Sequence, residues 1–255
     1  LRPWMSVITA TDPDHLDIYG TPEAYRESFE HFTSLIRPDG YLILKKGAPV
    51  TPRVNSGVKI FTYSETEGDY HAENIRIGGG EIVFDYVSPS GKITDISLGV
   101  PVKVNIENAV AAIASAQLCG VTPDEIRAAM RTFGGAKRRF DFLLKTPNLV
   151  FIDDYAHHPN ELTASIQSIR QLYPDKKVTG VFQPHLYTRT RDFVDEFAQS
   201  LSLLDDVVLL DIYPAREEPI PGVTSEIIFD KITSKEKVLL KKAELLPFLM
   251  NLELE

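Results

Sequence analysis

The chain has only one cysteine among its 255 residues, Cys119, so it cannot form an internal disulfide. This cysteine usage is typical of proteins in reducing compartments. No apolar run approaches the roughly 20 residues that a membrane-spanning helix needs, and no signal-peptide pattern heads the sequence. These absences exclude a disulfide-stabilised scaffold and predict a cytoplasmic protein that does not bind membranes.

Basic residues are also scarce relative to acidic ones. The sequence has 27 lysines and arginines against 36 aspartates and glutamates, a formal net charge of −9. Sequence-independent binding to nucleic acid needs a basic surface, so we expect no nucleic-acid partner. A local basic patch that binds a phosphorylated small molecule is compatible with this balance.

Three common catalytic signatures are missing: the GxxxxGK[ST] phosphate loop, the GxSxG nucleophile elbow and the CxxC pair. The first residue is Leu1, not methionine, and an apolar run from Trp4 to Ile8 begins almost at once. We therefore expect the chain to be part of a longer polypeptide whose N-terminal part is absent here.

The first half of the chain has the pattern of a mixed α/β domain. Thr21-Pro22-Glu23 combines the cap, the proline and the acid of a helix start, and strands are expected at 7–9 and 41–44. Alternation with a period of two from about Val58 to Leu98 indicates a small antiparallel excursion. Two helices are then expected, at 105–118 and 122–133.

The second half alternates expected strands and helices, which indicates a mostly parallel, right-handed wound sheet. The expected strands are 149–153, 178–182, 207–211 and 238–240, and the expected helices are 161–172, 191–204, 225–232 and 243–249. The segment 134–139, rich in glycine and basic residues, breaks the pattern. We therefore predict an α/β protein of two domains, 1–138 and 139–255.

The most informative segment lies at the first strand of the second half. The apolar run from Leu149 to Ile152 predicts a buried parallel strand, and the sequence Asp-Asp-Tyr-Ala-His-His-Pro follows it at 153–159. The strand at 178–182 likewise ends in a polar cluster, 183–191, with His185, Arg189 and Arg191. Ligands of open α/β sheets bind beyond the carboxyl ends of the strands, so both clusters predict a site for a charged ligand.

Three further groups of polar residues have both a functional and a plain interpretation. His15, flanked by aspartates, suits a magnesium site or a solvated loop. Asn105 and Asn108 can contact an adenine edge together, or cap the helix that begins there. The basic run 137–139 can bind phosphate in a cleft or remain solvated.

Five segments of the sequence occur in the order seen in the Mur ligases, and the chain resembles that family over essentially its whole length. They are Thr-Asp-Pro-Asp-His at 11–15, Asn-Ile-Glu-Asn-Ala at 105–109, Lys-Arg-Arg-Phe-Asp at 137–141, Asp-Asp-Tyr-Ala-His-His-Pro at 153–159 and Gln-Pro-His-Leu-Tyr-Thr-Arg-Thr-Arg at 183–191. The resemblance implies the second half of a central ATPase domain followed by a Rossmann-like C-terminal domain. It also implies an ADP-forming ligation in peptidoglycan synthesis, with ATP and Mg²⁺ as cofactors and UDP-N-acetylmuramate and L-alanine as substrates.

The resemblance assigns a role to each matching residue. His15 is expected to ligate magnesium, Asn108 to contact adenine with Asn105 beside it, Arg139 to meet phosphate or ribose, and Asp154 to bind the ribose hydroxyls. Tyr155, His157, His185 and Arg189 are expected to face the muramate carboxylate and the alanine, and His157, His185 and Arg189 to be catalytic. Either histidine titrates in the right range to accept a proton from the amine.

Two positions depart from the family pattern, and two other functions fit the sequence. Leu186 replaces a common arginine and Val104 a common histidine. A sibling ligase that attaches a recycled tripeptide shares much of the pattern, and a non-catalytic module could retain the fold. We expect the 255-residue chain to be inactive by itself because it lacks the phosphate loop and the UDP-binding domain.

Overall fold

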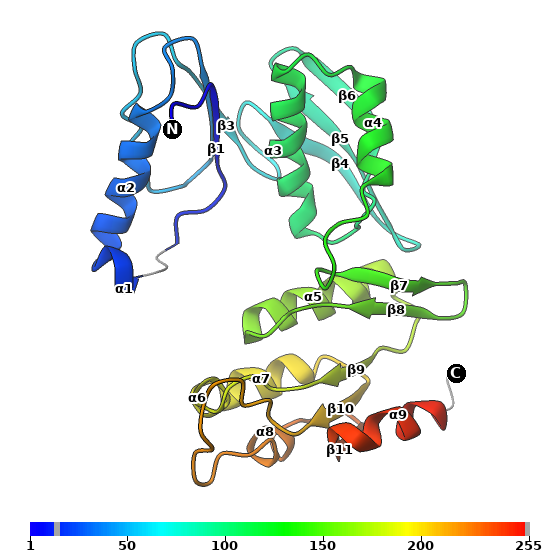
Figure 1. Cartoon of the computed structure of the whole chain (residues 1–255). Helices are drawn as coiled ribbons and strands as arrows, with labels where there is room; N and C mark the ends of the chain where they lie inside the picture. Colours follow the sequence, from blue (N-terminus) through cyan, green and yellow to red (C-terminus); the bar gives the residue numbers. More distant parts are fainter. Residues whose placement is uncertain (13–15, 253–255) are drawn as a thin grey trace. The chain divides into compact units, whose positions relative to one another are not determined.

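A computed structural model describes residues 1–12 and 16–252 of the chain, which form two compact units (Figure 1). Unit 1 comprises Leu1–Ile77 and Glu81–Gly134, and unit 2 comprises Gly78–Gly80 and Gly135–Glu255. The three glycines Gly78–Gly80 thus belong to unit 2, although the residues on either side of them belong to unit 1. In the part of the chain that the structure describes, no helix has both the length and the apolar character to cross a bilayer.

Unit 1 begins with a three-stranded parallel sheet in the order β1-β2-β3, made of Met5–Ile8, Tyr41–Lys45 and Lys59–Tyr63. The helices α1 (Leu16–Tyr19) and α2 (Pro22–Ser34) connect β1 to β2, and Thr21 caps α2 as predicted. The expected antiparallel excursion is wrong for β3, which pairs in parallel with β2. Alternation with a period of two identifies a strand but does not encode the direction of its partner.

The remainder of unit 1 is an antiparallel sheet covered by two helices. Its strands are β4 (His71–Gly78), β5 (Glu81–Ser88) and β6 (Gly91–Ser97). The helices are α3 (Val104–Leu118) and α4 (Pro123–Thr132). The inward side chains are fully buried, and they are Ile82, Phe84, Tyr86, Ile96, Ile106 and Ile113.

Unit 2 opens with a two-stranded antiparallel hairpin of β7 (Asp141–Lys145) and β8 (Val150–Asp153), followed by α5 (Pro159–Leu172). The prediction of a buried parallel strand at 149–153 is therefore wrong in both respects. β8 pairs antiparallel with β7, a strand that the sequence reasoning missed, and Phe151 is 51% exposed. A short apolar run is compatible with a buried parallel strand, but the partner decides its environment.

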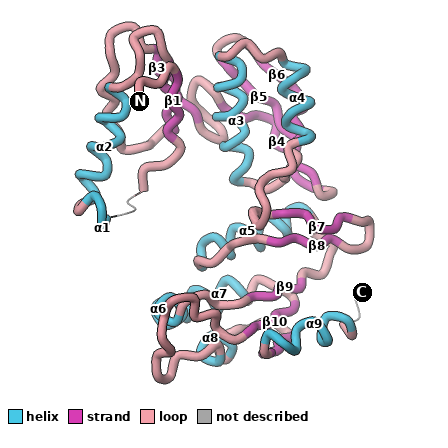
Figure 2. The backbone as a smooth tube through the Cα atoms, in the orientation of Figure 1, coloured by secondary structure: helices cyan, strands magenta, loops and turns pink. Residues whose placement is uncertain are grey.

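The rest of unit 2 is a parallel three-stranded sheet in the order β11-β10-β9, formed by Glu236–Leu240, Asp206–Leu210 and Thr179–Phe182. Figure 2 shows helices alternating with these strands along the chain. They are α6 (Tyr187–Asp192), α7 (Val194–Leu201), α8 (Glu226–Phe229) and α9 (Lys242–Met250). The expected single helix at 191–204 is broken at Phe193, where α6 ends and α7 begins.

Candidate active site

Two hydrogen bonds join the segment after β8 to the residues just before β7. The N–H of Phe140 donates to Asp154 Oδ1 at 3.2 Å, and the N–H of Tyr155 donates to the carbonyl of Arg138 at 2.8 Å. Arg138 and Phe140 have positive φ angles, 60° and 52°, which curl the backbone into a tight turn. These two hydrogen bonds hold the turn, and with it Arg139, beside the polar motif.

Three of the predicted site residues form a row of ring contacts. The guanidinium of Arg139 lies 5.6 Å from the centroid of the Tyr155 ring, and the Tyr155 and His157 rings lie 5.2 Å apart, edge to face. A cation over an aromatic face is attracted by the ring quadrupole. The sequence reasoning named all three residues, and the structure brings them together.

Glu161 at the start of α5 is a site residue to which the sequence reasoning gave no role. Its Oε2 accepts from the N–H groups of His157 and His158 at 3.0 and 3.2 Å, and lies 3.3 Å from His157 Nδ1. Burial raises the pKa of Glu161, but hydrogen bonds from both N–H groups and the charges of His157 and Arg139 leave that pKa below its ordinary value. A glutamate three residues after a helix cap is a readable sequence signal.

The turn from β9 to α6 presents the second polar cluster. Leu186 has a φ of 75°, which a leucine rarely adopts. Its N–H donates to the Tyr213 carbonyl at 3.0 Å, and the Tyr213 N–H donates to the Pro184 carbonyl at 2.8 Å. The His185 ring stacks on the Tyr213 ring with centroids 5.1 Å apart. The loop after β10 therefore fixes the position of His185.

Arg189 follows His185 by four residues, in the helix α6, whose first turn is held by a second contact from the loop after β10. Glu217 accepts from the Thr188 N–H at 3.0 Å and from its hydroxyl at 2.5 Å, which anchors the first turn of α6. These hydrogen bonds, together with the charge of Arg189, lower the pKa of Glu217. Arg189 Nη1 donates to the His185 carbonyl at 3.5 Å.

The pKa of His185 lies below its ordinary value of 6.5. The causes are burial first, then the positive charges of Arg189 and His157, with Glu217 opposing them. His157 and His185 are thus within electrostatic range of each other. In Figure 1 both β8 and β9 run toward the side of unit 2 where α6 lies. The two polar clusters therefore share one edge of unit 2, and it carries Arg139, Tyr155, His157, His185 and Arg189.

Asn105 and Asn108 lie at the start of α3, in unit 1. The Asn108 carboxamide donates to Asn105 Oδ1 at 3.2 Å, and that of Asn105 donates to the Val100 carbonyl at 3.1 Å. The N-cap of α3 is Lys103, and no side chain caps this helix. The plain interpretation of the two asparagines as caps is therefore wrong. Their contact with adenine stays a prediction.

The predicted magnesium ligand His15 lies outside the residues that the structure describes. Within residues 1–12 and 16–252, no group of three or more histidine, cysteine, aspartate or glutamate side chains is arranged to hold a metal ion. The ligation of magnesium by His15 stays a prediction.

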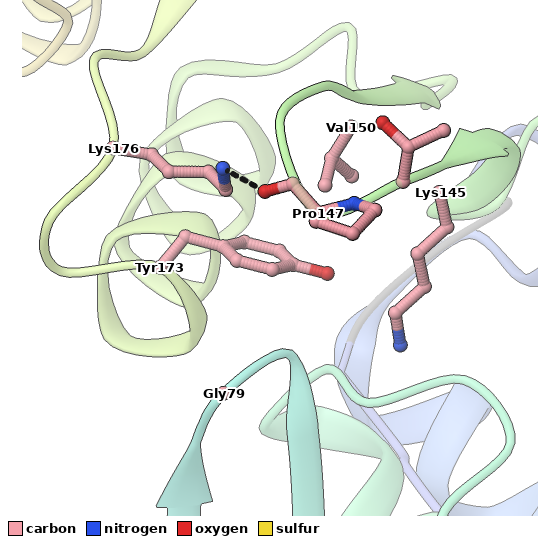
Figure 3. Close-up of a pocket in the computed structure, with 7 residues that line it drawn as sticks. Gly79, Lys145, Pro147, Val150, Tyr173 and Lys176 are labelled. Carbon is pink, nitrogen blue, oxygen red and sulfur yellow. Dashed lines mark hydrogen bonds between the residues drawn. The ribbon is translucent and has the colours of Figure 1, made fainter.

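A cavity of about 530 Å³ lies at the other end of the β7–β8 hairpin (Figure 3). Lys145 Nζ donates to the Gly80 carbonyl at 2.9 Å, and Lys176 Nζ donates to the Pro147 carbonyl at 2.7 Å. The Tyr173 hydroxyl between them is buried and has no hydrogen-bond partner among the described residues. None of the predicted site residues lines this cavity.

Comparison with known families matches two adjacent domain profiles. Residues 1–116 match the Mur ligase middle domain, and residues 138–247 match the glutamate ligase domain of the Mur ligases. The second match begins inside the turn that carries Arg139, and it contains both polar clusters.

Curated relatives resemble the chain over nearly its whole length. UDP-N-acetylmuramate–L-alanine ligase of Parabacteroides distasonis is 67% identical over 247 residues, which cover 96% of this chain and 54% of that protein. The ligase of the same name from Phocaeicola vulgatus is 62% identical over 256 residues, covering 100% of this chain and 56% of that protein. The chain thus spans about half the length of the curated relatives it matches.

Among solved structures, the fold is similar to UDP-N-acetylmuramate-alanine ligase MurC from Thermotoga maritima. The TM-score is 0.79 at 25% sequence identity, and the match covers 99% of this chain and 54% of that one.

Proposed function

The chain belongs to the Mur ligase family, and from that membership we propose that it forms the nucleotide- and substrate-binding half of a UDP-N-acetylmuramate–L-alanine ligase. Residues 1–138 would be part of the central ATP-binding domain and residues 139–255 the C-terminal domain. The identity of 67% to an enzyme of that name supports the proposal. The predicted cytoplasmic location belongs to the same proposal.

The single observation that carries the proposal is the shared edge of unit 2. There Arg139 and Arg189 offer guanidinium groups, His157 and His185 offer imidazoles, and the carboxylate of Asp154 lies next to Tyr155 in the chain. Guanidinium groups match the geometry of carboxylate and phosphate oxygens. This edge therefore suits an anionic substrate.

The proposed reaction has two steps. The γ-phosphoryl group of ATP passes to the muramate carboxylate, which gives an acyl phosphate and ADP. The alanine amine then attacks the acyl carbon, the C–N bond forms and inorganic phosphate leaves. Such reactions depend on positioning and on neutralisation of charge more than on covalent chemistry.

Asn108 and Asp154 each retain a side-chain oxygen that a nucleotide could use. Asn108 donates one N–H to Asn105 and keeps its carboxamide oxygen, and Asp154 uses one oxygen for Phe140. We propose that Asn105 and Asn108 bind adenine, Asp154 the ribose, and Arg139 the ribose or a phosphate. Magnesium, held by His15 with residues outside this chain, would neutralise phosphate charge.

Activity would require a further segment that carries a phosphate loop, since this sequence contains no GxxxxGK[ST] pattern. We expect no phosphate release when the purified 255-residue chain is mixed with ATP, UDP-N-acetylmuramate and L-alanine. A polypeptide extended to the length of the relatives should release phosphate with L-alanine but not with the stem tripeptide. Turnover by the short chain, or a preference for the tripeptide, would refute the proposal.

The role of Arg189 has a matched control in the same helix. Arg189→Ala in the extended protein should lower kcat/KM for UDP-N-acetylmuramate roughly 10- to 100-fold, the effect of losing a charged hydrogen bond. Arg191 pairs with its neighbour Asp192 at 2.7 Å, so Arg191→Ala should leave kcat/KM nearly unchanged. Equal effects of the two substitutions would contradict a specific role for Arg189.

A further inference from the structure

His157 meets two hydrogen-bond acceptors at the same ring nitrogen. Its Nδ1 lies 3.0 Å from the Tyr155 carbonyl oxygen and 3.3 Å from Glu161 Oε2. Neither oxygen can donate, because one is a carbonyl and the other belongs to a carboxylate. A neutral imidazole satisfies this environment only with its hydrogen on Nδ1, which leaves the lone pair on Nε2.

The Glu161 carboxylate is itself held in place, so its oxygen stays directed at Nδ1 of His157. The same Oε2 accepts from the N–H groups of His157 and His158, which ties the carboxylate to the first turn of α5. Hydrogen bonds from these groups and nearby positive charge keep the pKa of Glu161 low, despite its burial. Glu161 therefore remains an ionised acceptor at neutral pH.

The remaining surroundings of His157 leave Nε2 available. The Tyr155 ring packs edge to face against the imidazole, and the guanidinium of Arg139 lies 5.6 Å from the centroid of the same tyrosine ring. His185 is within electrostatic range of His157, and Arg189, Arg216 and Glu217 are the other charged groups that act on His185. No hydrogen bond from a described residue reaches His157 Nε2.

We propose that Glu161 is a positioning residue that fixes His157 as the Nδ1–H tautomer, so that Nε2 accepts a proton from the incoming amino acid. The choice of the incoming amino acid as the proton donor rests on the ligase function proposed above. The ammonium group loses one proton to Nε2, which yields a free amine and an imidazolium ion beside the Glu161 carboxylate. The amine then attacks the acyl carbon and forms the C–N bond as the C–O bond to phosphate breaks. The second proton that the nitrogen loses leaves with the departing phosphate, and the imidazolium later releases its own proton to water.

The tautomer is measurable on the 255-residue chain without any activity. In two-bond ¹⁵N–¹H correlation spectra of histidine-labelled protein, neutral His157 should show a protonated Nδ1 and an unprotonated Nε2. The signals are assigned by their loss in His157→Gln. In Glu161→Ala the two nitrogens should report a mixture of tautomers, whereas Glu161→Gln, whose carbonyl can still accept, should retain more of the Nδ1–H form.

Glu125 in α4 offers a control for the structural role of Glu161. It closes a reciprocal capping box with Thr122, whose N–H donates to Glu125 Oε2 at 2.9 Å, and no histidine takes part. Glu125→Ala should remove a comparable cap and leave the His157 signals unchanged. A pure Nδ1–H tautomer in Glu161→Ala, or an Nε2–H tautomer in the wild type, would overturn the inference.

Assays of a polypeptide extended to the length of the relatives test this inference separately from the ligase function. Glu161→Ala should lower kcat/KM for L-alanine roughly 10- to 100-fold, less than the full contribution of a positioned base, with KM for ATP unchanged. Glu125→Ala should leave both values unchanged. An inactive wild-type protein would refute the ligase function and leave the tautomer result intact, whereas full activity of Glu161→Ala would refute the role of Glu161 alone.

Discussion

The surroundings of His185 in unit 2 make the stability of the protein depend on pH. Burial and the charges of Arg189 and His157 disfavour its protonated form, and its pKa lies below the ordinary 6.5. The unfolded chain therefore binds a proton at a higher pH than the folded protein does. His185 contributes stability above about pH 6.5, and this contribution falls as the pH drops toward its lower folded-state pKa.

Because the pKa of His185 is lowered in the folded state, the free energy of unfolding should depend on pH. Between about pH 7 and pH 5, the range in which histidine titrates, the free energy of unfolding should fall more steeply for the wild type than for His185→Gln. Urea unfolding monitored by circular dichroism at several pH values measures the two slopes. Parallel slopes would show that His185 is not held neutral by its surroundings.

Leu186 shows how a residue can hold a site geometry at a local cost. Its backbone angles, φ 75° and ψ 135°, lie in a region that L-residues rarely adopt, at a cost of about 1–3 kcal/mol. Two backbone hydrogen bonds with Tyr213 and Pro184 flank the position and maintain it. The conformation turns the chain sharply between β9 and α6, so that His185 and Arg189 face the same edge.

At the scale of elements, the junction between β6 and α4 depends on a glycine. A Cβ atom on Gly99 would overlap the carbonyl oxygen of Phe133 and lie 2.9 Å from that of Arg131. The Gly99 N–H also donates to the Met130 carbonyl at 2.9 Å, which fixes the end of α4 on this turn. Gly99 therefore allows the helix to approach the sheet.

Gly99→Ala should consequently destabilise unit 1 by about 1–3 kcal/mol, because backbone atoms must move to admit the methyl group. Gly134 is a matched control: no atom lies within 4 Å of the position of its Cβ. Gly134→Ala should be neutral or slightly stabilising, by up to about 1 kcal/mol, since alanine restricts the unfolded chain. Equal denaturation midpoints for the two variants would contradict the packing argument.

On the scale of the whole molecule, the two units have separate hydrophobic cores. Phe197 on α7 is 1% exposed in the core of unit 2, where it packs with Ile166, Val178 and Leu201. The single tryptophan, Trp4, lies in unit 1 beside Tyr41. Tryptophan fluorescence therefore reports the unfolding of unit 1 alone, whereas circular dichroism reports both units.

Phe197→Ala should lower the stability of unit 2 by about 3–5 kcal/mol, the cost of a cavity left by a buried phenylalanine. The circular dichroism transition should shift to a lower urea concentration, and the fluorescence transition of Trp4 should not. A shift of both transitions by the same amount would mean that the two units unfold as one.

Features that depend on residues close together in the chain can be predicted from the sequence. The caps of α2 and α4 at Thr21 and Thr122 follow from side-chain hydrogen bonds over three residues, and the expected helices match α3 and α5 closely. The polar motifs after 153 and 183 were recognisable because they interrupt apolar runs. Family membership followed from these local patterns and their order.

The pairing of strands and the contacts between distant side chains, by contrast, are set by the three-dimensional fold. The pairing of β8 with β7 and of β3 with β2 depends on contacts between segments distant in sequence, and periodicity does not encode them. The same holds for Tyr213 and Glu217, which reach His185 and Thr188 from another loop. The choice of proton position on His157 depends on distances of about 3 Å between Nδ1 and two oxygens, and folding alone sets these distances.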